Sequence, residues 1–248
     1  MASLCLYGFL FQLSLRIGKV RVADFGLPDL MAGTVFFTWF IGMSVRGFSG
    51  PSRVVTEQDL VGGGELYLLI ILAICGFLKL RKIDLIEQFG LTRVTFWKVP
   101  VFAFGLLLGL FPVLGAAGAI SQKFCGPDAQ PQEIVKFFQE AAKQGNSHSV
   151  LITVLIGGVL APVAEELMFR GYFYGVCKRY MGVIVGVVLN SLLFAAMHAN
   201  LAAFPSLCVL AFALTLAYEL TGCLLVPITM HAIFNLTMFS VMLNTVTP

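Results

Sequence analysis

The chain contains a succession of long apolar runs, and this feature constrains its fold more than any other. A helix needs roughly 20 mostly apolar residues to cross the hydrocarbon core of a bilayer, and several of the runs approach that length. Hydrophobic residues make up 58% of the sequence and charged residues only 12%, with a mean hydropathy of +0.92. A soluble domain has roughly 45–50% apolar and 25% charged residues. The surface of this chain is therefore expected to face lipid.

The runs divide at their polar breaks into about eight segments, so we predict an all-α, polytopic integral membrane helix bundle with about eight transmembrane helices. Helices are favoured because nothing in the sequence alternates with the period of two that a membrane β-barrel strand needs. The predicted segments are Ala2–Leu15, Leu27–Val45, Leu66–Leu80, Val99–Ile120, His148–Tyr174, Val183–Ala199, Leu201–Leu220 and Cys223–Val246. We treat residues 1–248 as a single membrane domain, in which residues 1–147 hold N-terminal spans of unknown role and residues 148–246 carry the candidate catalytic motifs.

The basic residues between the predicted segments are distributed unevenly. If the segments cross the membrane alternately, ten Lys and Arg residues fall on one side and five on the other. The richer side carries Arg16, Lys19, Arg21, Lys79, Arg81, Lys82, Arg93, Lys98, Lys178 and Arg179, and the poorer side carries Arg46, Arg53, Lys123, Lys136 and Lys143. Because cytoplasmic loops carry an excess of positive charge, the richer side is predicted to be the cytosol of a multi-pass protein in the cell (plasma) membrane.

This topology also assigns the connecting segments. Residues 46–65 and 121–147 are expected to face outward, and residues 81–98 are expected to form a cytosolic amphipathic stretch along the membrane interface. The basic clusters form no stripe that could follow phosphates, so no nucleic-acid partner is expected. The six cysteines show no CxxC spacing and are expected to be small core residues. No cleavable signal peptide is evident, so the first segment is expected to remain in the membrane.

Polar side chains that are rare in membrane spans are concentrated in about the last hundred residues. They are Glu165, Glu166, Arg170, His198, Glu219, His231 and Asn235. A charged side chain at mid-bilayer costs about 2.5–3.5 kcal/mol even on a lenient scale, so such residues normally face the bundle interior and have a function. Counted from the cytosolic helix ends, Glu165, His198 and His231 lie roughly 16, 22 and 12 Å deep. These similar depths favour a single cavity that opens toward the cytosol.

Two of these residues are adjacent glutamates. Glu166 has Arg170 four residues later, so the two side chains can form an intrahelical ion pair that supports the site. Glu165 then has no cation at ideal spacing and is the better candidate for a general base. His198 is its natural partner, because an imidazole can share the water that the base deprotonates. Phe194, one turn before His198, is expected to be a supporting core aromatic.

His231 and Asn235 lie one turn apart on another predicted helix. Both can present N–H donors to a single point, as stabilisation of a tetrahedral oxyanion requires. Taken singly, a histidine or an asparagine in a membrane span can equally serve as a hydrogen-bond partner between helices, with no catalytic part. Glu219, near a predicted cytosolic helix end, is expected to be solvated and receives no role.

The polar residues fall into three short motifs. They are Glu165-Glu166-Leu167-Met168-Phe169-Arg170, then Phe194-x-x-x-His198, then His231-x-x-x-Asn235, all within roughly residues 150–240. Their types and order resemble the signature of the CAAX protease and bacteriocin-processing family, also called the abortive-infection family, which includes the type II CAAX prenyl endopeptidases.

The resemblance implies an intramembrane glutamate-type endopeptidase that acts on a peptide or prenylated protein without a cofactor. In family terms, Glu165 and His198 activate the water, and Glu166 and Arg170 support the site. His231 would form the oxyanion hole together with Asn235. The oligomeric state is not predicted.

Two other interpretations remain open. Glu165, His198 and His231 could bind Zn²⁺ as a His₂Glu site with an open position for water. Against this, the sequence has no H-E-x-x-H pair, and Asn235 is a poor zinc ligand. The protein could also be a non-catalytic bacteriocin-immunity or membrane scaffold protein, in which the polar cluster only holds the helices together. We expect metal-independent hydrolysis.

Overall fold

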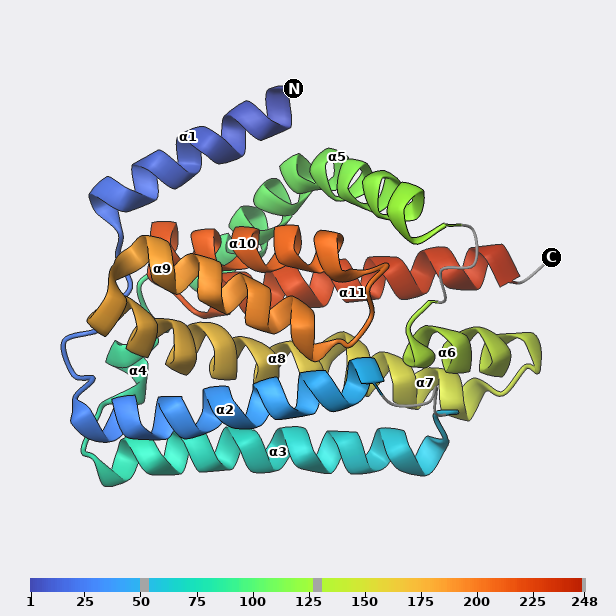
Figure 1. Ribbon diagram of the computed structural model, residues 1–248, viewed down its shortest axis with the longest axis horizontal. Coiled ribbons are helices and arrows are strands. Elements are labelled where there is room, and N and C mark those ends of the chain that lie inside the picture. The colour runs from blue at the N-terminus through green and yellow to red at the C-terminus, as the bar shows by residue number, and fades with distance from the viewer. Residues whose placement is uncertain (50–53, 127–130, 247–248) are drawn as a thin grey trace.

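The computed structural model describes residues 1–49, 54–126 and 131–246, and every regular element in these ranges is helical. In chain order the elements are α1 (Ala2–Ile17), α2 (Leu27–Ser49), α3 (Glu57–Leu80), α4 (Leu85–Gln88), η1 (Phe96–Lys98), α5 (Val99–Cys125), α6 (Glu133–Lys143), α7 (Ser147–Leu155), η2 (Ile156–Leu160), α8 (Ala161–Glu166), η3 (Leu167–Phe173), α9 (Tyr174–Met197), α10 (Phe204–Thr221) and α11 (Leu225–Val246). Most of them run along the long axis of the molecule in Figure 1. The predicted all-α fold class is confirmed for this part of the chain.

Six helical segments among the described residues are long and apolar enough to cross a membrane, so the predicted count of about eight is not confirmed. Part of the difference lies in α1, which is apolar but has only 16 residues. The rest lies in Ser147–Met197, a continuous helical segment of 51 residues that takes in two of the predicted spans. Inside this segment the backbone leaves helical geometry at Gly182, where φ is 82°.

The chain folds back on itself at Gly182. Glycine reaches a positive φ at little cost because it has no Cβ. A Cβ placed on Gly186 would lie 3.2 Å from the backbone nitrogen of Lys178 and 3.1 Å from the ring of Tyr174, so the residues after the bend pack directly against those before it. The polar break that was predicted to separate two spans corresponds to this bend.

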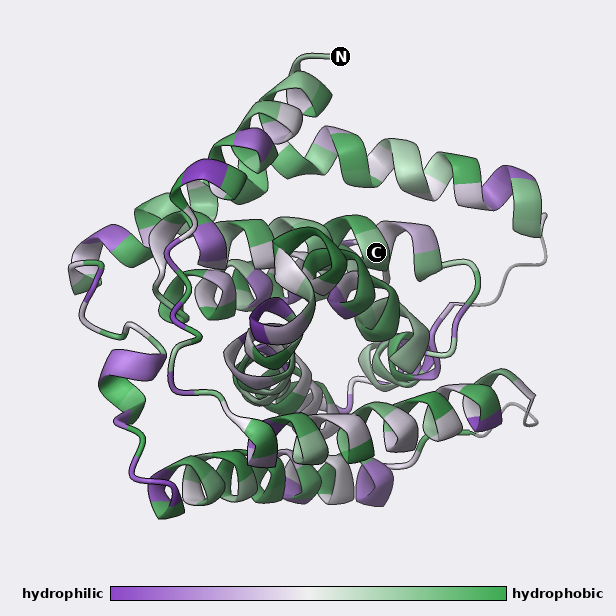
Figure 2. Cartoon of the chain, turned by 60° about the vertical axis from the view of Figure 1, so that its left-hand side comes forward, coloured by the Kyte–Doolittle hydropathy of each residue, from purple (hydrophilic) through white to green (hydrophobic). Residues whose placement is uncertain are grey.

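Three segments that were predicted to share the cytosolic side meet at one end of the bundle. Arg21, between α1 and α2, pairs with Glu87 of α4. It also pairs with Asp24 at 2.8 Å, and the hydrogen bond to this carboxylate raises the pKa of the Arg21 guanidinium. Lys178 reaches the same region and donates to the Val20 carbonyl at 3.1 Å. In Figure 2 the hydrophilic residues gather in these connecting segments, whereas the helices are mostly apolar.

Residues 81–98, predicted as an amphipathic stretch, form the two short helical elements α4 and η1 rather than one continuous helix. Between them the backbone turns at Gly90, where φ is 60°. The buried Gln88 donates from Nε2 to the Arg21 carbonyl at 3.1 Å, and the Leu224 N–H donates to the Phe89 carbonyl at 3.0 Å. These hydrogen bonds fix the segment to the end of the bundle.

The two segments predicted as outward loops are partly helical. α2 continues to Ser49, and α3 begins at Glu57, so the first of these loops is short; Arg53, which was assigned to it, lies outside the described residues. The second contains the amphipathic helix α6, which buries Phe138 and Ala141 and exposes charged residues on its other side.

The helices that carry the motifs lie in the interior of the bundle, and α2 and α3 lie at its periphery. In the most apolar 18-residue stretch of α10, half of the residues are buried, compared with 17% in the corresponding stretches of α2 and α3. The peripheral helices expose large apolar side chains, such as Val35 at 71% and Leu72 at 67%, as helices in contact with lipid do. α2 packs against α9, and α3 packs against α8 and η3.

Candidate functional site

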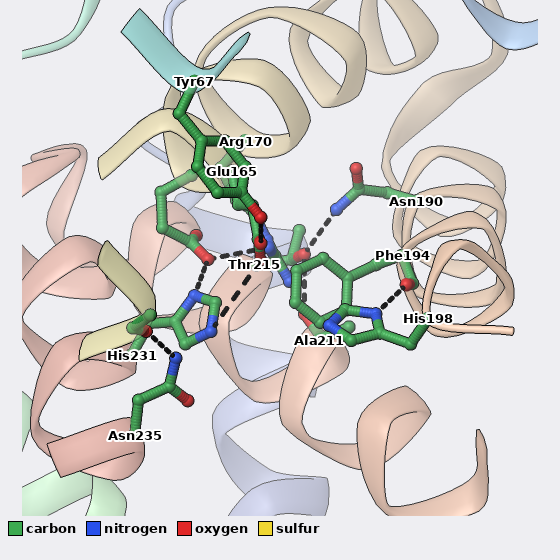
Figure 3. A network of polar contacts seen from close by, with 12 residues as sticks. Tyr67, Glu165, Arg170, Asn190, Phe194, His198, Ala211, Thr215, His231 and Asn235 are labelled. Atoms are coloured by element: carbon green, nitrogen blue, oxygen red, sulfur yellow. Dashed lines mark hydrogen bonds and ion pairs between the residues drawn. The ribbon is translucent and has the colours of Figure 1, made fainter. Parts of the chain in front are cut away.

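The three sequence motifs lie on three helical segments that meet in the interior of the bundle. Glu165 and Glu166 end α8, and Arg170 lies in the π-helical segment η3 that follows directly. His198 caps the end of α9, and His231 lies in the second turn of α11. Figure 3 shows the side chains of Glu165, His198 and His231 gathered in one region from their separate helices. Single π-helical turns inside α-helices occur frequently at functional sites.

A fully buried ion pair lies at the centre of this cluster. Arg170 Nη1 lies 2.8 Å from Glu166 Oε1, and neither side chain has exposed surface. The guanidinium also donates from Nη2 to the Ala211 carbonyl of α10 at 3.0 Å, and its carbon lies 4.5 Å from the centre of the Phe194 ring. The intrahelical pair expected from the four-residue spacing is therefore present, and it links η3 to α9 and α10.

His231 lies between the two glutamates. Its Nδ1 is 2.9 Å from Glu166 Oε1, and its Nε2 is 4.0 Å from Glu165 Oε2. Because a carboxylate only accepts hydrogen bonds, the proton on Nδ1 is directed at Glu166. The Nε2 atom therefore faces Glu165 at a distance that is too long for a direct hydrogen bond.

Glu165 is the less buried of the two carboxylates, with 12% of its side chain exposed. Its Oε1 accepts a hydrogen bond of 2.9 Å from the hydroxyl of Tyr67 on α3, which lies above it in Figure 3. Its Oε2 faces His231. Each oxygen of this carboxylate is thus directed at a different helix. Tyr67 could not be identified from the sequence, because a tyrosine within an apolar run carries no charge or motif spacing that would single it out.

His198 is oriented by its own helix. Its Nδ1 lies 2.8 Å from the Phe194 carbonyl oxygen, which can only accept, so Nδ1 carries a proton. In the neutral imidazole this leaves Nε2 as an acceptor. The Phe194 ring packs against His198 at 4.9 Å and against His231 at 5.7 Å between ring centres. Phe194 therefore contacts both imidazoles.

Asn235 donates from Nδ2 to the Gly157 carbonyl of η2 at 2.8 Å. In a π-helix this carbonyl would accept from the N–H five residues later, but that residue is Pro162, which has no N–H. The side-chain amide of Asn235 supplies the missing donor. An amide nitrogen carries two N–H groups, so the second one is not used by Gly157.

The structure does not bring every predicted pair into direct contact. His198 and Glu165 are not hydrogen-bond partners among the described residues; His198 contacts Phe194, and the imidazole beside Glu165 is that of His231. Within the described ranges, no group of three or more His, Cys, Asp or Glu side chains is arranged to hold a metal ion.

A second set of polar contacts borders the cluster and was not anticipated from the sequence. Asn190 Nδ2 donates to Thr215 Oγ1 at 3.0 Å, and Thr215 Oγ1 donates to the same Ala211 carbonyl that accepts from Arg170. Asn190 lies four residues before Phe194 on α9 and therefore shares its helix face. That spacing is the one signal in the sequence that could have indicated it.

The prediction that Glu219 is solvated is wrong. Its side chain is buried, and its Oε1 accepts from the Tyr174 hydroxyl at 2.5 Å and from Lys178 Nζ at 2.6 Å. Both partners lie on α9, more than 40 residues earlier, and α9 packs against α10. Position near a helix end suggested exposure, but the packing of a second helix removes it.

Comparison with known proteins agrees with the motifs. Residues 147–237 match the family described as type II CAAX prenyl endopeptidase Rce1-like. The resemblance drawn from the three motifs is confirmed over this segment. An uncharacterized 24.3 kDa protein of Escherichia coli is 29% identical over 206 residues, which cover 76% of this chain and 88% of that protein. No solved structure was found to match the chain.

Proposed function

We propose that this protein, whose residues 147–237 match a family of CAAX prenyl endopeptidases, is an intramembrane endopeptidase that hydrolyses a peptide bond with a water activated by Glu165. One observation carries the proposal: an arginine, a glutamate, a histidine and a second glutamate follow one another inside apolar helices, with separations of 2.8, 2.9 and 4.0 Å between successive side chains. Ionisable groups within a membrane span are costly and normally mark a functional site.

In the proposed reaction, Glu165 takes a proton from water, and the water oxygen attacks the carbonyl carbon of the substrate. His198 assists, since its Nε2 is free to accept a hydrogen bond from the same water. The negative oxygen of the tetrahedral intermediate is stabilised by N–H donors from His231 and Asn235. The proton then passes from Glu165 to the leaving nitrogen, and the C–N bond breaks to give a carboxylic acid and an amine. The second proton of the water passes from this acid to the amine, so the products are a carboxylate and an ammonium group.

The charges around His231 suit its proposed role. To donate from Nε2 while Nδ1 donates to Glu166, the imidazole must carry both protons. In that form the positive charges of His231 and Arg170 balance the negative charges of Glu165 and Glu166. A carboxylate that orients a histidine and stabilises its imidazolium is the arrangement used in the catalytic triads of hydrolases.

We further propose that the substrate is a peptide or a prenylated protein that reaches the site from the cytosolic side of the cell membrane. The family match and the excess of basic residues on the predicted cytosolic side support this proposal. We favour chemistry without a metal, because the sequence has no H-E-x-x-H pair and Asn235 is a poor zinc ligand. A cleavage assay distinguishes this proposal from a zinc-dependent protease and from a non-catalytic immunity or scaffold protein.

The test is cleavage of prenylated and unprenylated C-terminal peptides by the purified protein in detergent, with and without a chelator. Glu165→Gln is expected to abolish cleavage, and Glu140→Gln, which alters a carboxylate on the surface helix α6, is expected to leave it unchanged. Likewise His198→Ala is expected to lose activity and the exposed His148→Ala to keep it. Loss of activity on chelation would favour zinc chemistry. No cleavage of any peptide by the folded protein would favour the non-catalytic role.

A further inference from the structure

Tyr67 lies outside the family-matched segment and contacts the candidate general base. Its hydroxyl lies 2.9 Å from Glu165 Oε1, and the two residues are 98 positions apart in the sequence. A phenol hydroxyl that faces a carboxylate donates the hydrogen bond, since the carboxylate oxygens only accept. α3, one of the N-terminal spans, thus reaches into the polar cluster of the other half of the chain (Figure 3).

The position of Tyr67 follows from the pattern of α3. The helix buries Leu60, Gly64, Ile74 and Leu78, and Tyr67 lies on the same stripe at the three- and four-residue spacing of a single helix face. This face packs against α8 and η3, the elements that contain the catalytic motif. Tyr67 is therefore held on the inner side of a helix whose other sides are exposed.

A glycine one turn earlier lets the two helices approach closely. A Cβ placed on Gly64 would lie 3.2 Å from Ile156 Cδ1 and 3.7 Å from Leu160 Cδ2, both in η2. The distance to Ile156 is tighter than ordinary van der Waals contact, and the distance to Leu160 is an ordinary contact. Because Gly64 has no side chain, α3 can lie close to η2, and at this separation of the two helices the Tyr67 hydroxyl reaches Glu165.

The hydrogen bond fixes the orientation of the carboxylate. With Oε1 held by Tyr67, Oε2 of Glu165 faces His231 at 4.0 Å. A carboxylate that acts as a base must present one oxygen to the water in a constant geometry, and small misplacements of a reacting group lower the rate strongly. A tyrosine suits this position because its ring is apolar and only its tip donates.

We propose that Tyr67 is a positioning residue for Glu165, so that the N-terminal spans complete the active site rather than only surrounding it. The proposal rests on the proposed function of Glu165 as the base. It predicts that removal of the hydroxyl alone lowers kcat, because the carboxylate is free to rotate, and leaves KM nearly unchanged, because Tyr67 acts through Glu165 rather than on the substrate.

The test compares Tyr67→Phe with Tyr7→Phe in steady-state cleavage by the purified protein. Tyr7 is a matched control, because its buried ring also donates one hydrogen bond, to the Leu106 carbonyl at 2.7 Å, but it joins α1 to α5. Tyr67→Phe is expected to lower kcat about 10- to 100-fold with KM changed less than about threefold. Tyr7→Phe is expected to leave both constants unchanged.

A double variant separates positioning from a general structural effect. Glu165→Asp withdraws the carboxylate from the reach of Tyr67, so Tyr67→Phe is expected to cause little further loss in that background. Equal losses in both backgrounds, or full activity of Tyr67→Phe, would overturn the role of Tyr67. These results differ from failure of the proposed function itself, in which the wild-type protein cleaves no peptide and the role of Tyr67 falls with it.

Discussion

Arg170 is fully buried, and the groups that contact its guanidinium interact with its positive charge. It pairs with Glu166, donates to the Ala211 carbonyl and packs on the Phe194 ring, with no exposed surface. Removal of one partner from a buried pair leaves the other charge without compensation, which costs about 3–5 kcal/mol. Arg170 contacts both α9 and α10, so its loss also removes contacts that hold these two helices to η3.

We therefore expect Arg170→Ala to lower the free energy of unfolding by about 3–5 kcal/mol and to lower Tm accordingly. Thermal unfolding in detergent, followed by circular dichroism, measures this change. Arg179→Ala is the control, because Arg179 is an exposed arginine on the neighbouring turns of α9. An equal Tm for the two variants would show that the Glu166–Arg170 pair does not stabilise the bundle.

Individual site residues could be predicted from the sequence when their spacing placed them on one helix. The Glu166–Arg170 pair and the contact of Phe194 with His198 both follow from a four-residue interval. Contacts between helices could not be predicted in this way. Tyr67 was missed because nothing in α3 identifies its partner.

Helix α3 packs closely against the motif-bearing helices, and this packing positions Tyr67 beside Glu165. Gly64 lies against η2, whereas a Cβ on the adjacent Gly63 would meet no atom within 4 Å. Gly64→Leu is expected to push α3 outward, to destabilise the protein by about 1–3 kcal/mol, and to lower cleavage by separating Tyr67 from Glu165.

The matched control for this change is Gly63→Leu, which adds the same side chain on the open side of α3. Cleavage rates and Tm values of the two variants are compared with those of the wild type. If Gly64→Leu retained full activity, the close approach of α3 would have no part in positioning the site.

The apolar runs predicted the helices well but not all of their ends. The span predicted from Leu66 begins at Glu57 in α3, because Thr56 and Asp59 form a capping box that starts the helix before the apolar run. The bend at Gly182 fell in a predicted polar break, but hydropathy alone could not show that helical hydrogen bonding continues almost to that residue. Periodicity reports which face is buried, and capping decides where a helix begins.

The polar cluster lies inside the helix bundle, and most of the basic residues lie at one end of the bundle. The N-terminal segment, residues 1–147, and the motif-bearing segment, residues 148–246, contact each other most extensively through α5 with α10 and α11, and also through α2 with α9 and α3 with α8. The proposed orientation places the end that carries Arg21, Glu87 and Lys178 in the cytosol.

This orientation predicts which positions are accessible from outside the cell. In a Cys5→Ser protein, which lacks the exposed cysteine near the outer end of α1, Cys125 at the end of α5 is expected to react with a membrane-impermeant maleimide on intact cells, and Cys125→Ser is expected to abolish that labelling. Arg179→Cys, placed in the Cys125→Ser protein, is expected to react only after permeabilisation. The opposite pattern would reverse the orientation and move the opening of the site to the outer face.

Isotope transfer in a single turnover tests whether Glu165 activates a water that attacks the substrate directly. The purified protein, in excess over the peptide, cleaves it in water labelled with oxygen-18, and mass spectrometry locates the label. Direct attack puts the heavy atom into the new carboxylate of the peptide and none into Glu165. Label in the Glu165 carboxylate, with unlabelled product, would show that this side chain attacks the substrate itself and does not act as a base toward water.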